Sequence, residues 1–231
     1  DMVGQHSRVK NVLTVVVTGA AILWTLFPLY YLFLTSVKSG KTIMEYPPRL
    51  LVWPDFGIYQ HILIKEHFYR FFVNSFIISS GATLLALAIG GTAAFAFSHW
   101  SFRGKEPLFL ASMVGRMFPP ITTLIPIYLA VKLLNLVDTH LALIMIYASF
   151  QVPLILLILR DFFNQVPREI IECAYIDGCS SWMVFYRIVL PLAKNGIMAA
   201  GILCFVEAWN EFIFALVLTS FNAKTAPVVL A

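Results

Sequence analysis

Three polar residues lie close together in an apolar stretch near the end of the chain. Glu207, Asn210 and Glu211 are spaced i, i+3 and i+4, so a continuous helix would place two carboxyl groups and an amide on one face. A charge at the centre of a membrane span costs about 2.5 to 3.5 kcal/mol on insertion scales, so these groups need partners or water. We expect them to face the interior of a helix bundle. There they would either line a path for a polar solute or form a structural network with Arg116.

Two other polar side chains occur inside apolar stretches, and each stands near proline. Arg116 is followed by Pro119 and Pro120, whereas Gln151 is followed by Pro153. Proline removes a backbone donor and breaks or kinks a helix, and such breaks within a membrane often line a pathway. The candidate pathway residues are therefore Arg116, Gln151, Glu207, Asn210 and Glu211.

Other kinds of site have little support in the sequence. The five histidines are scattered without ligand spacing, and the three cysteines have neither CxxC spacing nor an even number. No nucleophile and base occur at a recognisable spacing. We therefore expect no metal site, no disulfide framework and no catalytic residue on this chain.

The composition is that of an integral membrane protein. Of the 231 residues, 60% are hydrophobic and only 12% are charged, and the mean hydropathy is +0.83. The net charge of +4 is spread over the segments between apolar runs, so we do not expect a nucleic-acid partner.

Five apolar runs approach or exceed the ~20 residues that a helix needs to cross the hydrocarbon core. We therefore predict an all-α, polytopic transmembrane bundle that forms one domain over residues 1–231, with 35–70 as a long loop outside the membrane. Residues 219–231 resemble a loop and the opening of an expected sixth span. The five predicted spans are 12–34, 72–98, 108–134, 141–163 and 196–218.

Several local features within these runs predict packing and helix ends. Residues Ala82, Ala86, Gly90 and Ala94 form a stripe of small side chains that lets another helix approach closely. Asp138 stands just before the fourth run and is predicted to cap that helix.

The segment 167–191 is more polar than the runs on either side. Pro167 favours the start of a short amphipathic helix, Gly178 can end it in the left-handed conformation, and Ser180 or Ser181 can cap a second helix. These signals predict a helix, a turn and a helix at one membrane face. Lysines and arginines divide eight against seven between the two faces, with Arg116 inside a span, so their count does not orient the bundle.

The hairpin sequence resembles the EAA signature of ABC importer permeases, which is EAA, three residues, G, nine residues, I, one residue, LP. Cys173 replaces an alanine of that pattern, which exchanges one small residue for another. All other positions agree in type and spacing. The matching positions are Glu172, Cys173, Ala174, Gly178, Ile188, Leu190 and Pro191.

Four further stretches resemble the carbohydrate, or maltose-type, branch of this family. They are FPLYYLFLTSVKS from Phe27, NSF from Asn74, RMFPPITTLIPIYL from Arg116 and EAWNEF from Glu207. Together with the signature they extend over most of the chain in matching order. The resemblance implies a type I ABC importer permease in a prokaryotic inner or plasma membrane.

The resemblance also implies a mechanism, in which the hairpin is cytoplasmic and its first helix couples to an ATPase subunit. The residues expected to form this coupling site are Glu169, Ile170, Ile171, Glu172, Cys173, Ala174, Tyr175, Asp177 and Gly178. Its isoleucines, alanine and tyrosine would form an apolar contact surface. Its glutamates would pair with basic groups of the ATPase subunit.

The expected partners are a second permease, two ATPase subunits that hold ATP and Mg²⁺, and an extracytoplasmic solute-binding protein at the 35–70 loop. This chain itself is expected to hold no cofactor and to perform no catalysis. The expected solute is a sugar, oligosaccharide or polyol. The alternatives are a permease for a glycerol phosphate or a peptide, or a polytopic membrane enzyme or receptor.

Overall fold

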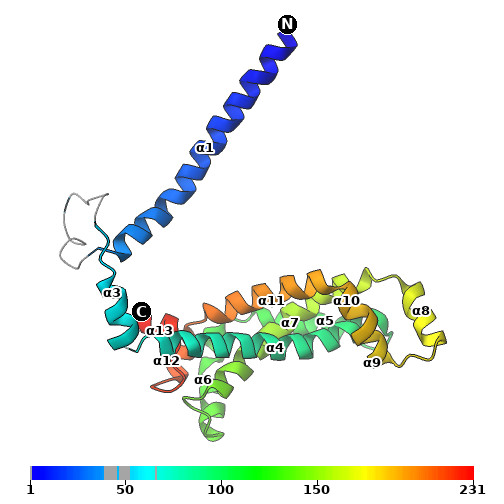
Figure 1. Cartoon of the computed structure of the whole chain (residues 1–231). Helices are drawn as coiled ribbons and strands as arrows, with labels where there is room; N and C mark the ends of the chain where they lie inside the picture. Colours follow the sequence, from blue (N-terminus) through cyan, green and yellow to red (C-terminus); the bar gives the residue numbers. More distant parts are fainter. Residues whose placement is uncertain (1, 39–45, 47–52, 66) are drawn as a thin grey trace. The chain divides into compact units, whose positions relative to one another are not determined.

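The computed structural model describes residues 2–38, 46, 53–65 and 67–231, and every regular element within them is helical. The chain divides into two units, Asp1–Phe68 and Tyr69–Ala231. Figure 1 shows the helices coloured along the sequence.

The first unit contains the long helix α1, Met2–Ser36, which includes the predicted first span. Two short elements, α3 at Gly57–Gln60 and the π-helix η1 at His61–Lys65, fall within the predicted external loop. Residues 39–45, 47–52 and 66 of that loop lie outside the described residues.

The second unit is built on two long helices, α4 at Tyr69–His99 and α7 at His140–Asn164. The predicted small-residue stripe of α4 is buried where these helices pack. A Cβ atom on Gly90 would lie 2.8 Å from Cγ2 of Ile155, so only glycine permits this approach. The structure confirms that the stripe serves helix packing.

The predicted third span is broken at the prolines, as the sequence indicated. Helix α5, Lys105–Met117, and helix α6, Pro120–Leu133, meet at an angle of 94°. Pro119 has extended backbone angles and no N–H group, so the hydrogen-bond ladder cannot continue through it.

The hairpin consists of a short helix followed by a composite one. Helix α8 covers Arg168–Ile176, and the second limb continues without interruption from Ser181 to Leu192. This limb contains α9 at Ser181–Val184, the π-helix η2 at Phe185–Val189 and α10 at Leu190–Leu192. It meets helix α11, Lys194–Trp209, at an angle of 80° shortly after Pro191.

The prediction of one continuous fifth span over 196–218 was wrong. Helix α11 ends at Trp209, and the chain resumes as the short helices α12, Ile213–Leu218, and α13, Ala226–Leu230. The break follows from Glu211, whose carboxylate accepts hydrogen bonds from the first N–H groups of α12.

Among the described residues, three helices are long and apolar enough to cross a membrane: residues 13–36 of α1, and helices α4 and α7. The number rises to five if each bent pair forms one span. The second pair joins the limb 181–192 to α11, so part of the hairpin predicted to lie at one membrane face is apolar enough to belong to a span.

Two hydrophobic clusters stabilise the second unit. One joins the later halves of α4 and α7 to the hairpin and α11, with Ile155, Phe163 and Val184 at its centre. The other joins the earlier halves of α4 and α7 to α6, α12 and α13 around Leu143 and Phe214. The hairpin is therefore anchored in the same core as the long helices.

Candidate functional site

The turn of the hairpin is set by Gly178, which has φ +83°. Its N–H donates to the carbonyl of Tyr175 at 3.1 Å, and the N–H of Cys179 donates to that of Ala174 at 2.9 Å. This pair of bonds is the Schellman motif, which requires the left-handed conformation at its glycine. Asp177 is the C-cap of α8. The predicted role of Gly178 in ending the helix is confirmed.

The second limb begins at Ser180, whose hydroxyl accepts a hydrogen bond from the N–H of Met183 at 3.3 Å. Of the two serines predicted as caps, Ser180 therefore takes the role. Pro167 is the N-cap of α8 rather than its first helical residue. Both ends of the turn are thus fixed by local bonds, which give the hairpin a defined shape.

The residues of the predicted coupling site divide between the inside and the surface of the hairpin. Ile171 and Ala174 are buried in the core, whereas Ile170 is 44% exposed and Tyr175 is 40% exposed. Glu169, Glu172 and Cys173 are also exposed. The four apolar residues therefore do not form one outward face, because two of them hold α8 to the bundle.

The predicted coupling site did not include one exposed apolar residue of α8. Ile176, the last residue of α8, is 84% exposed and stands directly before the turn. The signal available in the sequence was an isoleucine between Tyr175 and Asp177, outside the apolar spacing of the buried pair. It extends the apolar surface of α8 to the tip of the hairpin.

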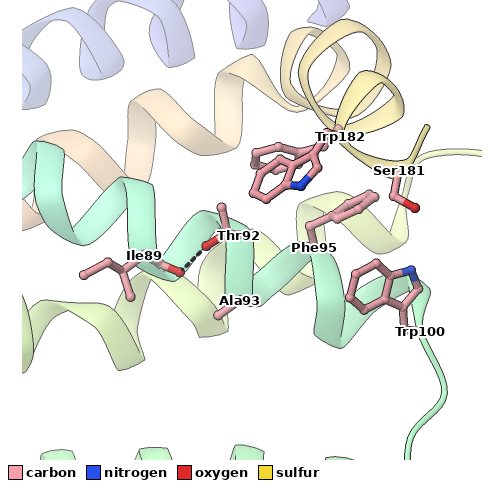
Figure 2. A pocket seen from close by; sticks show the side chains of 8 residues that line it. Ile89, Thr92, Ala93, Phe95, Trp100, Ser181 and Trp182 are labelled. Atoms are coloured by element: carbon pink, nitrogen blue, oxygen red, sulfur yellow. Dashed lines mark hydrogen bonds between the residues drawn. The ribbon is translucent and has the colours of Figure 1, made fainter. Parts of the chain in front are cut away.

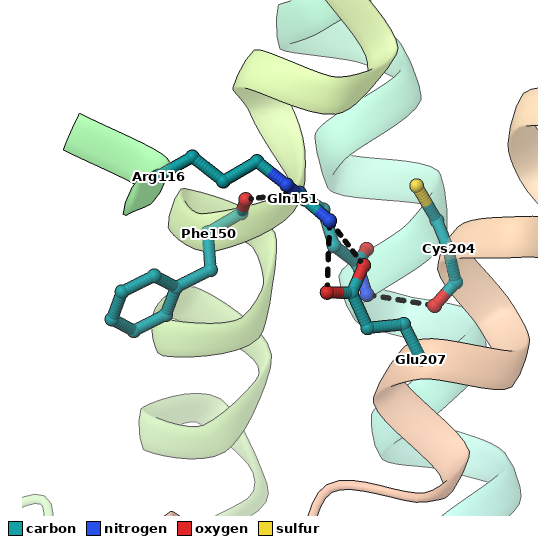
Figure 3. A network of polar contacts seen from close by, with 5 residues as sticks. All are labelled: Arg116, Phe150, Gln151, Cys204 and Glu207. Carbon is teal, nitrogen blue, oxygen red and sulfur yellow. Dashed lines mark hydrogen bonds and ion pairs between the residues drawn. The ribbon is translucent and has the colours of Figure 1, made fainter. Parts of the chain in front are cut away.

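Arg116, Phe150 and Glu207 form a polar network that joins α5, α7 and α11 (Figure 3). The Nη2 atom of Arg116 lies 3.0 Å and 3.1 Å from the two carboxylate oxygens of Glu207. Its Nη1 atom donates to the carbonyl oxygen of Phe150 at 3.1 Å. The two charged side chains keep 31% and 48% of their surface exposed, so the pair is both a link between helices and an accessible polar surface.

Gln151 lies beside this pair but is almost fully buried (Figure 3). Its amide nitrogen donates to the carbonyl of Cys204 at 2.8 Å, which ties α7 to α11. Its Oε1 atom has no hydrogen-bond partner among the groups that the structure describes. A buried amide held in this way ties α11 to α7.

Glu207, Asn210 and Glu211 do not share one helical face, contrary to the prediction. Asn210 caps the end of α11, and its amide donates to the carbonyl of Val206 at 2.8 Å. Glu211 lies beyond the helix and accepts hydrogen bonds from the N–H groups of Phe214 and Ala215 at the start of α12. A carboxylate in that place satisfies donors that α12 would otherwise leave unpaired.

The position of Glu211 is also fixed by Tyr147 of α7. The hydroxyl of Tyr147 donates to the second carboxylate oxygen of Glu211 at 2.6 Å. Because this contact joins residues far apart in the sequence, spacing alone could not reveal that the helix would stop at Trp209. The structure gives Glu211 a clear structural role.

Asp138 has a different role from the helix cap that the sequence predicted. Thr139 caps α7 by accepting from the N–H of Ala142, and Asp138 instead binds a loop distant in sequence. Its carboxylate accepts from four consecutive backbone N–H groups, those of residues 220–223, at 3.0 to 3.2 Å. Asp138 has φ +60°, a conformation that asparagine and aspartate tolerate better than most residues.

The charge state of Asp138 follows from these bonds. Partial burial alone would raise the pKa of the carboxyl group. The four backbone N–H groups outweigh this effect and lower the pKa to about 2.

Asn74 and Ser75 of α4 hold the same loop from another side. The amide of Asn74 donates to the carbonyls of Asn222 and Lys224, and its oxygen pairs with Nε2 of His140 at 2.8 Å. The hydroxyl of Ser75 accepts from the N–H of Ala226 at 2.9 Å. The NSF stretch therefore fixes the chain between α12 and α13.

Within the described part of the chain, no group of three His, Cys, Asp or Glu side chains is arranged to hold a metal ion. The accessible polar groups of the second unit include the Arg116 and Glu207 pair. The exposed side of α8 carries the apolar residues Ile170, Tyr175 and Ile176.

The chain belongs to the family of binding-protein-dependent transport system inner membrane components, whose pattern matches residues 86–230. It is therefore the permease component of an ABC importer, a multi-pass inner-membrane protein that is not itself catalytic. A system of this kind works with an ATPase and a binding protein. The family prediction from the sequence is confirmed.

Relatives of known sequence support this assignment. The chain is 33% identical to a probable ABC transporter permease, y4oR, of Sinorhizobium fredii, over 92% of this chain and 80% of that protein. It is also 33% identical to the trehalose transport system permease SugB of Mycobacterium tuberculosis, over 95% and 79%. A sulfoquinovosyl glycerol transport system permease, SmoH, of Agrobacterium fabrum is 31% identical over 87% and 70%.

A solved structure has the same fold. A chain of a bacterial ABC transporter involved in the import of the acidic polysaccharide alginate superposes with a TM-score of 0.78, covering 96% of this chain and 79% of that one. The two sequences are 24% identical, so the likeness concerns the fold. The predicted all-α permease bundle is confirmed.

Proposed function

We propose that this permease imports a carbohydrate and that its hairpin passes the motion of the ATPase into the membrane helices. The observation that carries the coupling role is the geometry of α8. A rigid Schellman turn and two buried residues, Ile171 and Ala174, fix this helix to the core, while its opposite side stays exposed. A helix held in this way transmits a displacement to the bundle instead of yielding to it.

The exposed side of α8 suits a groove on a protein partner. It combines Ile170, Tyr175 and Ile176 with the carboxylates of Glu169 and Glu172. Large apolar side chains supply most of the energy of such contacts, and charges at their edge select the partner. Asp177 and Gly178 then set the direction in which the chain leaves the contact.

A carbohydrate solute is supported by the relatives and by the polar surface. Several relatives are named as permeases for trehalose, diacetylchitobiose or sulfoquinovosyl glycerol. The Arg116 and Glu207 pair offers donors and acceptors suited to hydroxyl groups. Asn210 is exposed one turn further along and adds an amide.

The working assembly in this proposal contains a second permease, two ATPase subunits and an extracytoplasmic solute-binding protein. The Arg116 and Glu207 pair is partly exposed, and in this proposal the second permease lines the pathway on the exposed side. ATP and Mg²⁺ belong to the ATPase subunits, and this chain supplies no ligand to either.

The coupling role is tested by Gly178→Ala, with Gly104→Ala as a matched control. Both glycines have left-handed backbone angles, φ +83° and +87°, and an added Cβ atom would meet nothing within 4 Å at either place. The backbone strain is therefore the same, about 1 to 2 kcal/mol. We expect Gly178→Ala to lower solute-stimulated ATPase activity and uptake in the assembled transporter, and Gly104→Ala to leave both near the wild-type values.

Equal effects of the two substitutions would contradict the coupling role, because they would show only the cost of strain.

Uptake of labelled trehalose, maltose and a peptide by cells that carry the transporter tests the solute class. Uptake of the peptide and of neither sugar would contradict a carbohydrate solute.

A further inference from the structure

The contact between Arg116 and Glu207 leaves hydrogen-bonding capacity on both side chains. A guanidinium group has five N–H donors and a carboxylate has about four acceptor sites, so the three contacts of Arg116 saturate neither group. Both side chains are also partly exposed. A hydroxyl group donates and accepts, and it can therefore bind Glu207 and Arg116 together without separating them.

An anionic group meets the same pair under different conditions. A carboxylate or phosphate only accepts hydrogen bonds, so it needs the donors of Arg116. Glu207 already faces the Nη2 atom of Arg116 with both of its oxygens. The anion must either displace Glu207 from its cation or lie beside a second negative charge, and both arrangements are unfavourable.

The three helices that meet at the pair supply no second cation near it. The other lysines and arginines of α5, α7 and α11 are Lys105, Arg160 and Lys194. Each stands at least ten residues from the network along its own helix, which corresponds to about 15 Å or more at 1.5 Å per residue. An anion at the pair would therefore depend on Arg116 alone.

Glu211 adds a second carboxyl group at the same end of α11. It is held there by the hydroxyl of Tyr147 and by the first N–H groups of α12. This end of α11 therefore carries two carboxyl groups for one guanidinium group and has no excess of positive charge.

The apolar cavity beside the hairpin differs from the pair in its chemistry (Figure 2). It has a volume of about 450 Å³, and no charged side chain lines it. Figure 2 shows Trp182 and Trp100 on either side of Phe95, and the hydroxyl of Thr92 donates to the carbonyl of Ile89 in its own helix. This cavity cannot distinguish solutes by their charge.

We propose that the Arg116 and Glu207 pair selects the solute by charge, so that it accepts an uncharged sugar and rejects an anionic one. Glu207 is the specificity-determining residue, because it neutralises Arg116 and repels a second anion. This inference rests on the solute contact proposed above and adds the charge of the solute to it. A uronic acid or a glycerol phosphate is excluded at this point of the pathway.

The test is saturation-transfer NMR of the assembled permease and ATPase subunits in nanodiscs at pH 7. The solute-binding protein is omitted, so that its own preference does not enter the measurement. The probes are methyl glucoside and methyl glucuronide, which differ only in a hydroxymethyl group and a carboxylate. We expect the wild type to transfer saturation to the glucoside about tenfold more strongly than to the glucuronide.

Two substitutions separate the charges of the pair. Glu207→Gln keeps the shape of the side chain but leaves Arg116 without its anion, so the preference should reverse in favour of the glucuronide. Arg116→Gln leaves Glu207 in place, so the glucuronide should remain excluded while the glucoside signal falls.

Two further variants serve as controls. Glu106→Gln removes a carboxylate that pairs with Arg160 at the other end of α5. Thr92→Phe fills the apolar cavity. Both should keep the preference of the wild type for the glucoside.

A continued preference of Glu207→Gln for the glucoside would overturn the selection by charge, although the solute contact itself would stand. Loss of the glucoside signal in Thr92→Phe would also overturn it, because the sugar would then occupy the apolar cavity. Saturation transfer to neither sugar in the wild type would overturn the solute contact at the pair and this inference with it.

Discussion

At the scale of single residues, Arg116 and Glu207 form an ion pair that, in the function we propose, also contacts the solute. The Nη2 atom of Arg116 contacts both carboxylate oxygens of Glu207 and so joins α5 to α11, and both side chains are partly exposed. A partly exposed ion pair contributes little to stability, about 0.2 to 1 kcal/mol. Its loss should therefore affect transport more than folding.

We predict that Glu207→Gln lowers uptake strongly while the melting temperature of the purified transporter changes little. Glu106→Gln is the matched control, because it breaks a comparable pair with Arg160 between α5 and α7. Uptake should remain near the wild-type value in the control. A large loss of thermal stability in Glu207→Gln alone would show a purely structural role for the pair.

Asp138 stabilises the loop 220–223 in a pH-dependent way. Because its folded-state pKa is lowered to about 2, the carboxylate stabilises the loop fully above the unfolded value of 3.8. That contribution is lost as the pH falls through about 2. Hydrogen exchange of the amides of residues 220–223 should accordingly lose protection only in strong acid.

Asp138→Asn separates the charge from the backbone conformation, since asparagine also tolerates φ +60°. We expect this variant to show at neutral pH the weak protection that the wild type reaches only near pH 2. The exchange of amides in the middle of α7 serves as an internal control. Unchanged protection of the loop in the variant would contradict a role for the charge.

At the scale of elements, the close packing of α11 on α7 depends on Gly196. A Cβ atom there would lie 2.3 Å from the ring of Phe162, whereas one on Gly201 of the same helix would lie 3.5 Å from Leu87. The first distance forces a rearrangement and the second is an ordinary contact.

We predict that Gly196→Ala destabilises the transporter by about 1 to 3 kcal/mol, the usual cost of overpacking. Gly201→Ala should be neutral or slightly stabilising, because alanine favours the helix by about 1 kcal/mol over glycine. Thermal unfolding of the two variants checks this difference. Equal melting temperatures would mean that Phe162 moves aside at no cost.

At the scale of the whole molecule, the exposed tip of the hairpin should decide whether the assembly forms. Ile176→Asp places a charge where an 84% exposed isoleucine now stands. Burial of such a side chain contributes about 1.5 to 3 kcal/mol, so we expect the ATPase subunit to copurify poorly with this variant. The second permease should still copurify, and its loss as well would indicate misfolding.

The sequence by itself determined the features that depend on near neighbours and on composition. Membrane insertion, the small-residue stripe of α4, the break at Pro119 and the turn at Gly178 follow from apolar runs, missing donors and backbone preference. The motif spacing likewise identified the family, because the hairpin is a local unit that the chain order alone specifies.

The tertiary structure decided the features that depend on distant groups. The end of α11 at Trp209 reflects the contact of Glu211 with Tyr147, and Asp138 finds its partners more than 80 residues along the chain. Only packing against the core could show that Ile171 is buried while Ile170 is exposed. The fold decides which distant groups pair with each hydrogen-bond donor and which cover each apolar surface. The periodicity of the sequence does not contain this information.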